Sequence, residues 1–423
     1  MLHIMIRRLL LIFDPELSRK VWLLQLGVLI NFFGNGLVAP FLIIYLHFGR
    51  GIPLALAGSA VALGGITAVT SGLLAGALSD RIGPRNTLVV AMCSNAAAYL
   101  LYTQVSAPWE AFGVGLLVGV GTGAYGPSAQ NMVASMVPAE NRQAALAQQR
   151  VTSVVGLGLG ATLGGILAAR GLEGYLELLV LDAVTFLTFT AVLLTLPSGR
   201  VDPRAAAAGS YALVVRDRAF LRLVGVNIAL VTAGIAPMLV LLPAYAKLQA
   251  HISEPVIGAI YAANTLTIVA AQLPLTRLTR GRNRMLVLRA AAVIWVACWL
   301  ICLFAGGWLS GNVAALVIGL ASIGYAIGEC FYSAIVVPTA VALAPDHLRG
   351  RYLGMMGLSW QAGFLLGPSL GGMVLGVFPL GLPIACAAIC LLAAAGTTAV
   401  DRELGNDQRR IPAPVPLAVG GRP

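Results

Sequence analysis

Apolar stretches recur along the whole chain, each about as long as a helix needs to cross a membrane and each followed by a short polar segment. Roughly 20 apolar residues in a helix span about 30 Å of hydrocarbon. Twelve such stretches are visible, at residues 21–46, 54–77, 86–105, 109–136, 149–169, 174–196, 221–246, 255–276, 285–306, 312–338, 352–376 and 379–400. The pattern therefore predicts an all-α membrane protein with twelve transmembrane helices.

Composition agrees with this prediction, and the basic residues orient the chain. Hydrophobic residues make up 59% of the sequence and charged residues only 10%, which is too apolar for a soluble protein of this length. Of the 27 lysines and arginines, all but Arg50, Arg170 and Lys247 fall in segments that share one side of the membrane. Because cytoplasmic loops concentrate such residues, we expect both termini to be cytoplasmic. The net charge of +11 then needs no nucleic acid to explain it.

The second half of the pattern repeats the first. A shift of 207 residues places GLGLGATLGG (156–165) on GFLLGPSLGG (363–372). The glycines that coincide are Gly156 with Gly363, Gly160 with Gly367, Gly164 with Gly371, and Gly165 with Gly372. Small residues at such spacing let membrane helices approach closely. Their coincidence predicts two six-helix halves in a single chain.

The repeat also sets the expected domain boundaries. We predict a cytoplasmic N-terminal segment at 1–20, an N-terminal half at 21–196 and a C-terminal half at 221–400. The cytoplasmic linker at 197–220 is long enough to join two halves that move. The cytoplasmic tail at 401–423 ends in a stretch rich in Pro and Gly, which predicts disorder.

The loop after the second stretch, GALSDRIGPRNTL, carries a specific pattern. Its spaced residues are Gly76, Asp80, Arg81, Gly83 and Arg85. This spacing resembles the signature loop of the major facilitator superfamily, and with the twelve stretches and two halves the resemblance covers nearly the whole chain. It implies that superfamily's fold, with Asp80 in a lock on the cytoplasmic side and the two arginines completing a charge cluster. Pro84 stands where the family usually has a base.

The physics of this loop leads to a simpler alternative. Gly83 permits a tight turn between two helices, and the charges of the loop serve only to set the topology. The corresponding loop of the second half keeps Gly281 and several bases but has no acid. Only the first half can therefore supply the lock.

The repeated glycines resemble the antiporter motif of the same superfamily. Residues 363–372 carry the full pattern with Pro368, whereas residues 156–165 have Ala161 in place of the proline. The resemblance implies the twelve-helix drug:proton antiporter group, with the glycine faces as sliding contacts. Plain helix packing is the alternative, because glycines serve that purpose in any bundle.

In a transporter of two such halves, substrate and coupling ion bind near the bilayer midplane between them. Side chains expected to line that cavity are Asn31, Asn35, Tyr125, Gln130, Asn131, Asn227, Tyr261, Asn264, Tyr325, Trp360 and Gln361. These groups are neutral, which suits an amphipathic or modestly polar organic substrate. A strongly anionic substrate would need buried arginines.

Two acids lie away from the ends of the apolar stretches, Glu329 and Asp182. No intramembrane arginine or lysine is visible to neutralise Glu329, so desolvation favours its protonated form. We expect Glu329 to couple protons or to contact a substrate cation, with a hydrogen-bonded structural acid as the alternative. Asp182 lies in the outer half of its stretch and is the second candidate. A structural role is favoured there unless the acid faces an aqueous vestibule.

The sequence thus predicts a secondary active transporter in a bacterial inner (plasma) membrane, which exports small organic or amphipathic compounds in exchange for protons by alternating access. Its partners are a small-molecule substrate, protons and the lipid bilayer. We expect no cofactor, no metal, no nucleic acid and a monomer. An importer or facilitator of a nutrient, metabolite or lipid stays open. A membrane-embedded enzyme is disfavoured because the loops are short and no nucleophile elbow, metal-binding spacing or phosphate loop is present.

Overall fold

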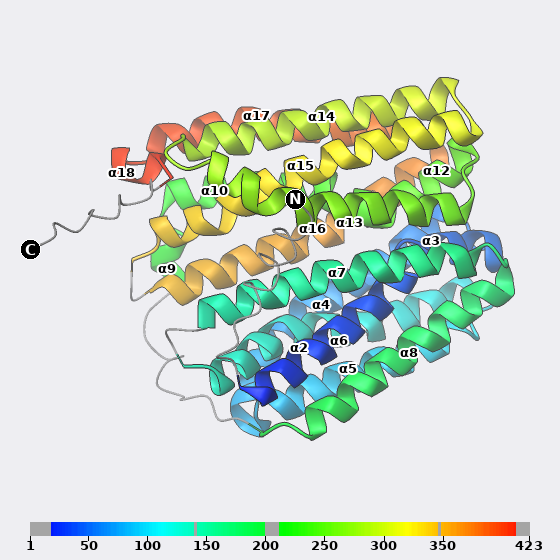
Figure 1. Ribbon diagram of the computed structural model, residues 1–423, viewed down its shortest axis with the longest axis horizontal. Coiled ribbons are helices and arrows are strands. Elements are labelled where there is room, and N and C mark those ends of the chain that lie inside the picture. Colours follow the sequence, from blue (N-terminus) through cyan, green and yellow to red (C-terminus); the bar gives the residue numbers. More distant parts are fainter. Residues whose placement is uncertain (1–17, 139–141, 199–210, 346–347, 412–423) are drawn as a thin grey trace, which may run out of the picture.

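Helices account for nearly all of the chain that the computed structural model describes, which is residues 18–138, 142–198, 211–345 and 348–411 (Figure 1). Within those ranges the one extended pairing is an isolated antiparallel bridge between Asn283 and Arg410. A backbone in hydrocarbon has no water to bond, so the helix satisfies its polar groups internally. The all-helical prediction is confirmed.

The first group of helices packs together in the lower part of Figure 1. It consists of α2 (Arg19–Val38), α3 (Leu42–Ile44), the π-helix η1 (Tyr45–Gly49), α4 (Leu54–Ile82), α5 (Pro84–Tyr102), α6 (Pro108–Met136), α7 (Arg142–Ala168) and α8 (Leu172–Leu194). Within it, α2 lies against α7 and α8, and α6 lies against α4 and α5.

The second group fills the upper part of the same view. It consists of α9 (Tyr211–Val214), α10 (Arg218–Leu230), the π-helix η4 (Val231–Ile235), α11 (Ala236–Val240), α12 (Leu242–Ala250), α13 (Glu254–Leu278), α14 (Arg284–Trp308), α15 (Gly311–Leu343), α16 (Arg349–Val377), α17 (Gly381–Glu403) and α18 (Asn406–Arg409). The main contacts between the groups pair α4 with α16 and α7 with α13, and α3 also touches α12.

Nine helical stretches among the described residues are long and apolar enough to cross a membrane. Three further long helices, α5, α6 and α16, stand beside them in the same bundle (Figure 1). These three carry more polar side chains, such as Asn95 on α5, Gln130 on α6 and Gln361 on α16. Polarity, rather than length, is therefore what separates them from the other nine.

The two groups repeat each other in detail. The helix that begins with α2 breaks near Pro40, and the helix that begins with α10 breaks near Pro237 and Pro243, because proline lacks the N–H that continues a helix. After each break a buried tyrosine donates to a carbonyl of its own group. Tyr45 bonds the Tyr102 oxygen at 2.6 Å, and Tyr245 bonds the Cys302 oxygen at 2.9 Å. Both bonds span 57 residues of sequence, so the internal repeat extends beyond the glycine motifs.

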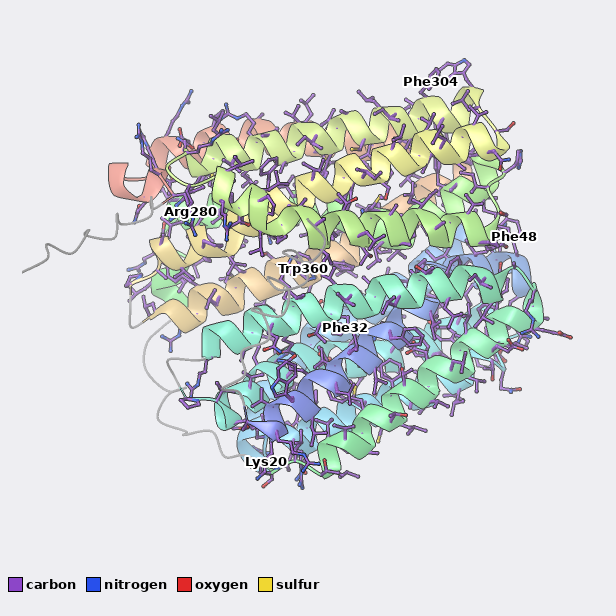
Figure 2. All side chains as sticks on the ribbon, in the orientation of Figure 1. Lys20, Phe32, Phe48, Arg280, Phe304 and Trp360 are labelled. Carbon is purple, nitrogen blue, oxygen red and sulfur yellow. The ribbon has the colours of Figure 1, made fainter. Side chains whose placement is uncertain are left out.

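The bundle has two distinct ends, which Figure 2 marks. Lys20 and Arg280 lie at one end, here called the basic end, and Phe48 and Phe304 lie at the other, the far end. The turn between α4 and α5 lies at the basic end. Gly83 has a φ of 87° there and Pro84 is the first residue of α5, so the predicted tight turn is present.

Residues after Asp401 are more ordered than expected, and the prediction of disorder from this point is wrong as far as Ile411. Asn283 donates to the Asp401 carboxylate at 2.8 Å, and Arg409 donates to its carbonyl at 3.0 Å. Ile411 bonds the backbone at Gly281 and Arg282. The polar loop after α13 thus provides partners that the composition of the tail does not reveal. Residues 1–17, 199–210 and 412–423 lie outside the described part of the chain.

Removing the hydroxyl of either buried tyrosine tests the paired tyrosine bonds. We expect Tyr45→Phe and Tyr245→Phe each to lower the free energy of unfolding by about 1 to 3 kcal/mol, because a buried carbonyl loses a hydrogen bond from the tyrosine hydroxyl. Thermal unfolding of the purified protein measures this. Thr188→Val, which removes an exposed hydroxyl bonded within its own helix, is the control. Equal effects in all three variants would contradict the role of the tyrosines.

Candidate functional site

The two groups of helices touch through glycines towards the far end. A Cβ built on Gly165 of α7 would lie 2.9 Å from the Cα of Gly258 on α13, and one built on Gly58 of α4 would lie 2.9 Å from the Cα of Gly372 on α16. Real Cβ atoms do not approach so closely, so these backbones meet only because side chains are missing. The two contacts occupy corresponding places in the repeat and together close this part of the space between the groups.

The other motif glycines have a different position from the one expected. Gly156, Gly160 and Gly164 pack against α2, within the first group. Their partners Gly363, Gly367 and Gly371 pack against η4, α11 and the Leu241 side chain, within the second. Close helix approach through these glycines is therefore present within each group, while sliding stays a prediction. Only the last glycine of each motif, Gly165 or Gly372, lies between the groups, while Pro368 presents its carbonyl to Gly58.

A polar cluster reinforces the closure at the far end. Tyr175 of α8 donates to Glu254 of α13 at 2.9 Å, and Lys247 of α12 pairs with the same carboxylate. The Lys247 ammonium also lies 4.6 Å from the ring centre of Phe48, a cation–π distance. These four residues, here called the far-end latch, come from both groups. They also explain why Lys247 is one of the few bases placed away from the basic end.

Glu329 lies near the middle of α15, half-buried, among aromatic side chains. Tyr325 and Tyr332 share its face of the helix, being four residues before it and three after it. The ring of Tyr332 lies 6.3 Å from that of Trp360, which lies 5.4 Å from that of Phe364. Figure 2 shows Trp360 on α16 and Phe32 on α2 on the sides where the two groups face each other. The acid therefore stands in an aromatic part of the space between the groups.

Arg150 is the site residue that the sequence interpretation missed. It lies inside α7, eight residues after the helix begins at Arg142, and its side chain is exposed. Its charge interacts with that of Glu329, although no direct ion pair between them occurs in the described part of the chain. The prediction that no base accompanies Glu329 is wrong. The predicted stretch 149–169 already contains Arg150, and the residues before it are rich in alanine and glutamine, which are good helix formers; this was the available signal.

The first group contributes mainly neutral groups to the same region. Phe32 and Tyr125 meet edge to face at 5.8 Å between ring centres, and both are half-buried. Asn35 is half-buried and donates to the carbonyl of Asn31 at 2.8 Å, while Asn31 itself is buried. The remaining predicted lining residues are Asn131 and Gln361, both half-buried, and Gln130, which is exposed.

Three predicted cavity residues instead hold the second group together. Asn227 donates to Ser359 at 2.6 Å and accepts from Tyr332 at 2.5 Å. Asn264 donates to the Ser322 carbonyl at 2.9 Å, and Tyr261 donates to the carbonyls of Met238 and Leu239. All three are buried with partners on neighbouring helices. The expectation that they line an open cavity is therefore not met in this structure.

Asp182 is completely buried within the first group. One of its carboxylate oxygens lies 3.1 Å from the Thr185 hydroxyl, and a side chain on Gly34 of α2 would collide with both residues. The other oxygen has no partner among the described residues. The suggestion that Asp182 faces an aqueous vestibule is wrong here, because α2 covers it.

The signature loop is only partly described. The surroundings of Gly76 and the side chain of Asp80 lie outside the described part, whereas the side chain of Arg81 is exposed. Arg85 donates to the Leu196 carbonyl at 3.0 Å, just past the end of α8. A base near the C-terminus of a helix interacts favourably with the helix dipole, so Arg85 has a structural role of its own. Its membership of a gating cluster stays a prediction.

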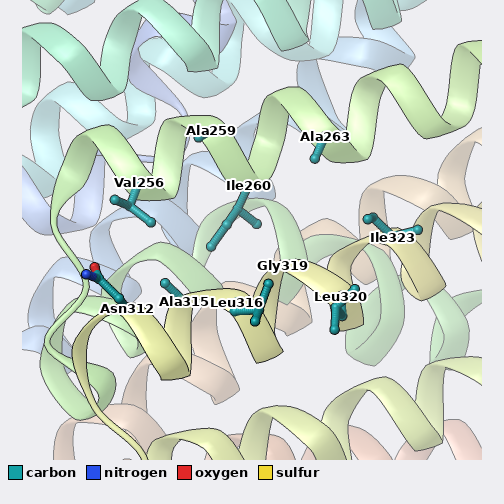
Figure 3. Close-up of a pocket in the computed structure, with 10 residues that line it drawn as sticks. All are labelled: Val256, Ala259, Ile260, Ala263, Asn312, Ala315, Leu316, Gly319, Leu320 and Ile323. Carbon is teal, nitrogen blue, oxygen red and sulfur yellow. The ribbon is translucent and has the colours of Figure 1, made fainter.

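An apolar groove of about 360 Å³ lies between α13 and α15 (Figure 3). Its lining includes Ala259, Ile260, Leu316 and Leu320. Leu316 and Leu320 are strongly exposed, which places the groove on the outer face of the bundle. It is separate from the region around Glu329.

Comparisons with known proteins agree with this architecture. A sequence model described as Major Facilitator Superfamily matches residues 24–328 and 228–417. Two relatives from Bacillus subtilis (strain 168), both uncharacterized MFS-type transporters, are YhjO and YqjV. YhjO is 23% identical over 87% of this chain and 89% of its own length, and YqjV is 22% identical over 86% and 88%.

Solved structures show the same fold at low identity. One is a POT family transporter in complex with 5-aminolevulinic acid, with a TM-score of 0.73 and 14% identity over 90% of this chain and 95% of that one. Another is a D-xylose-proton symporter, with a TM-score of 0.70 and 15% identity over 89% and 96%.

Removing one hydroxyl tests the far-end latch. In Tyr175→Phe the hydrogen bonds of this hydroxyl with Glu254 and Lys247 are lost while Glu254 keeps Lys247, so we expect the ratio of far-end-open to far-end-closed molecules to rise about fivefold, the effect of roughly 1 kcal/mol. Spin labels at Gly113→Cys and Gly307→Cys report the distance between groups, since an added side chain meets nothing there. Exposed Cys93 is replaced by serine.

The matched control is Glu177→Gln, which breaks the exposed pair with Arg170 inside the first group. It should leave the distance distribution unchanged. If Tyr175→Phe also leaves it unchanged, the latch does not hold the groups together.

Proposed function

Because the chain belongs to the Major Facilitator Superfamily, we propose that it is a secondary active transporter which exports small amphipathic organic compounds in exchange for protons. The fold and the MFS-type relatives support a membrane transporter. Proton coupling, export and the substrate class are our proposal. We also propose that α5, α6 and α16 cross the membrane like the other nine stretches, and that two six-helix domains move about the 197–220 linker.

The observation that carries the proposal is the position of Glu329. A carboxyl group deep in a membrane protein marks an ion or substrate path by default, and this one is half-buried among aromatic rings between the groups. The rings offer apolar surface and the carboxyl offers a site for one proton. Such a site can bind a proton or part of a substrate, but not both at once. This mutual exclusion is the basis of exchange.

Orientation gives the direction of the proposed cycle. With the basic end in the cytoplasm, as the distribution of bases predicts, the latch and the paired glycines close the outside. Glu329 would then release its proton towards the cytoplasm and take up substrate there. Rocking of the halves about the glycine contacts would carry the substrate outward, and Asp80 would lock the alternative state, as its loop implies.

Export in this scheme rests on the glycine motif of α7, which has Ala161 in place of proline. Its three glycines hold α7 against α2, so α7 moves with its own half. Rigid halves are what a rocking mechanism requires. The same rigidity would serve an importer equally well. The direction of transport therefore has to be measured directly.

Proton movement in liposomes tests the proposal. Purified protein is reconstituted with an internal pH dye, and amphipathic aromatic compounds, phenylalanine and phenethylamine among them, are added outside. We expect at least one compound to drive proton movement in the parent protein. In Glu329→Gln the compound should still bind but move no protons above protein-free liposomes, because the variant has no ionisable group there.

Asp182→Asn is the matched control, since this acid is buried within one group and should not be needed for coupling. Equal proton movement in the parent and in Glu329→Gln would make Glu329 a structural acid. Saturable flux down its own gradient without protons would instead indicate a facilitator.

A further inference from the structure

Two opposite charges face the same space from different halves of the protein. Arg150 is exposed on α7 and Glu329 is half-buried on α15. Exposed charges in the interior of a membrane bundle are costly unless water or a ligand meets them. Each charge here has its own helix and its own half, so a change in their separation accompanies any movement of the halves.

Helix geometry directs Arg150 inward. Residues 150, 157 and 161 recur at i, i+7 and i+11, which places them on one stripe of α7. The backbone at Leu157 contacts Gly36 of α2, and the backbone at Ala161 contacts Gly258 of α13. The stripe therefore points between α2 and α13, while Leu159 and Ile166 on another face are exposed towards the outside of the bundle.

The register of α7 against α13 sets the level of Arg150. Gly158 meets Thr265 where these antiparallel helices touch. Eight residues before Gly158 on α7 and eight residues after Thr265 on α13, Arg150 comes opposite residue 273, beside Gln272. Gln272 in turn approaches the Cys330 carbonyl at 3.4 Å and accepts from Ser333 at 3.2 Å. Arg150 thus stands at the level of the turn of α15 that carries Glu329, and the interaction of their charges agrees with this.

Aromatic surface lies on both sides of the pair. Tyr332, Trp360 and Phe364 form a chain of rings beside Glu329, and Phe32 with Tyr125 forms an edge-to-face pair in the other half. A guanidinium binds a carboxylate through paired N–H donors, and a carboxylate with aromatic faces suits an ammonium. The two halves therefore offer complementary ends of one binding site.

We propose that this site selects a zwitterionic aromatic or amphipathic compound, whose acidic group is held by Arg150 and whose amine is held by Glu329. The proposal rests on the transport function proposed above and names its substrate class. It replaces the expectation that only neutral side chains line the cavity, because Arg150 also faces this space.

The charge pattern explains why a zwitterion is preferred. A simple cation would bind Glu329 but be repelled by Arg150. A simple anion would bind Arg150 but be repelled by Glu329. A compound with both charges neutralises both residues and bridges the two halves. Because its amine and a proton compete for the same carboxylate, loading the compound displaces the proton, as exchange requires.

Binding to purified protein in lipid nanodiscs tests the proposal without requiring transport. The probes are phenylalanine, with phenethylamine and 3-phenylpropionate as the cation and anion of the same skeleton, each radiolabelled and measured by equilibrium binding. We expect the parent protein to bind phenylalanine about tenfold or more tightly than either relative, the effect of one charge-assisted contact. Arg150→Gln should abolish its advantage over phenethylamine, and Glu329→Gln its advantage over 3-phenylpropionate.

Arg170→Gln, at the other end of the same helical hairpin and exposed, is the control and should bind all three probes like the parent. Phenethylamine binding as tightly as phenylalanine in the parent, or no binding of any probe, would overturn the proposal. Zwitterion preference without any proton-linked flux would leave this inference standing and contradict the proposed function. Proton-coupled flux of cations alone would overturn this inference and support the proposed function.

Discussion

The cost of a charge away from water is the constraint on which this structure depends. A membrane protein keeps an ionisable group in its interior only where water, a counter-charge or a ligand meets it. Glu329 and Arg150 satisfy that condition together, because they lie on different halves and face one space. Asp182 is an exception: α2 covers it, and a hydroxyl of its own helix donates to one of its carboxylate oxygens. A carboxyl group therefore has two different roles in this protein, and only the surroundings of Glu329 and Asp182 distinguish them.

In the proposed mechanism, backbone packing determines how the two groups of helices move around these charges. Three glycines of each motif fasten a helix to its own half, and the fourth meets a glycine of the other half. A contact without side chains has little to interlock, so it permits rotation while keeping the backbones close. The far-end latch adds a bond that one hydroxyl and one carboxylate can make or break. Rigid halves, a smooth pivot and a polar latch are the parts that alternating access needs.

The repeated glycines and the loop GALSDRIGPRNTL pointed to the repeat and the superfamily, and hydrophobic patterning was enough to predict the helices, because hydrocarbon thickness and backbone satisfaction leave few choices. It was less informative about polar residues. Asn227 and Asn264 were expected in the cavity but bond neighbouring helices, since sequence gives depth along a helix and not the face. Arg150 was counted with the cytoplasmic bases although it lies at the start of the predicted stretch 149–169, and α7 begins still earlier, at Arg142. The contacts of Ile411 with Gly281 and Arg282 could not be foreseen either, as they join residues far apart in sequence.

Accessibility of position 329 from each side of the membrane is the most direct test of the central claim that this residue lies on a path open to one side at a time. Glu329→Cys, in a chain whose six native cysteines are replaced, is exposed in oriented vesicles to a membrane-impermeant maleimide. The account predicts labelling from the basic end in the latched protein, and labelling from the far end that increases when Tyr175→Phe weakens the latch. Absence of labelling from either side, or labelling from the far end that ignores the latch, would contradict it.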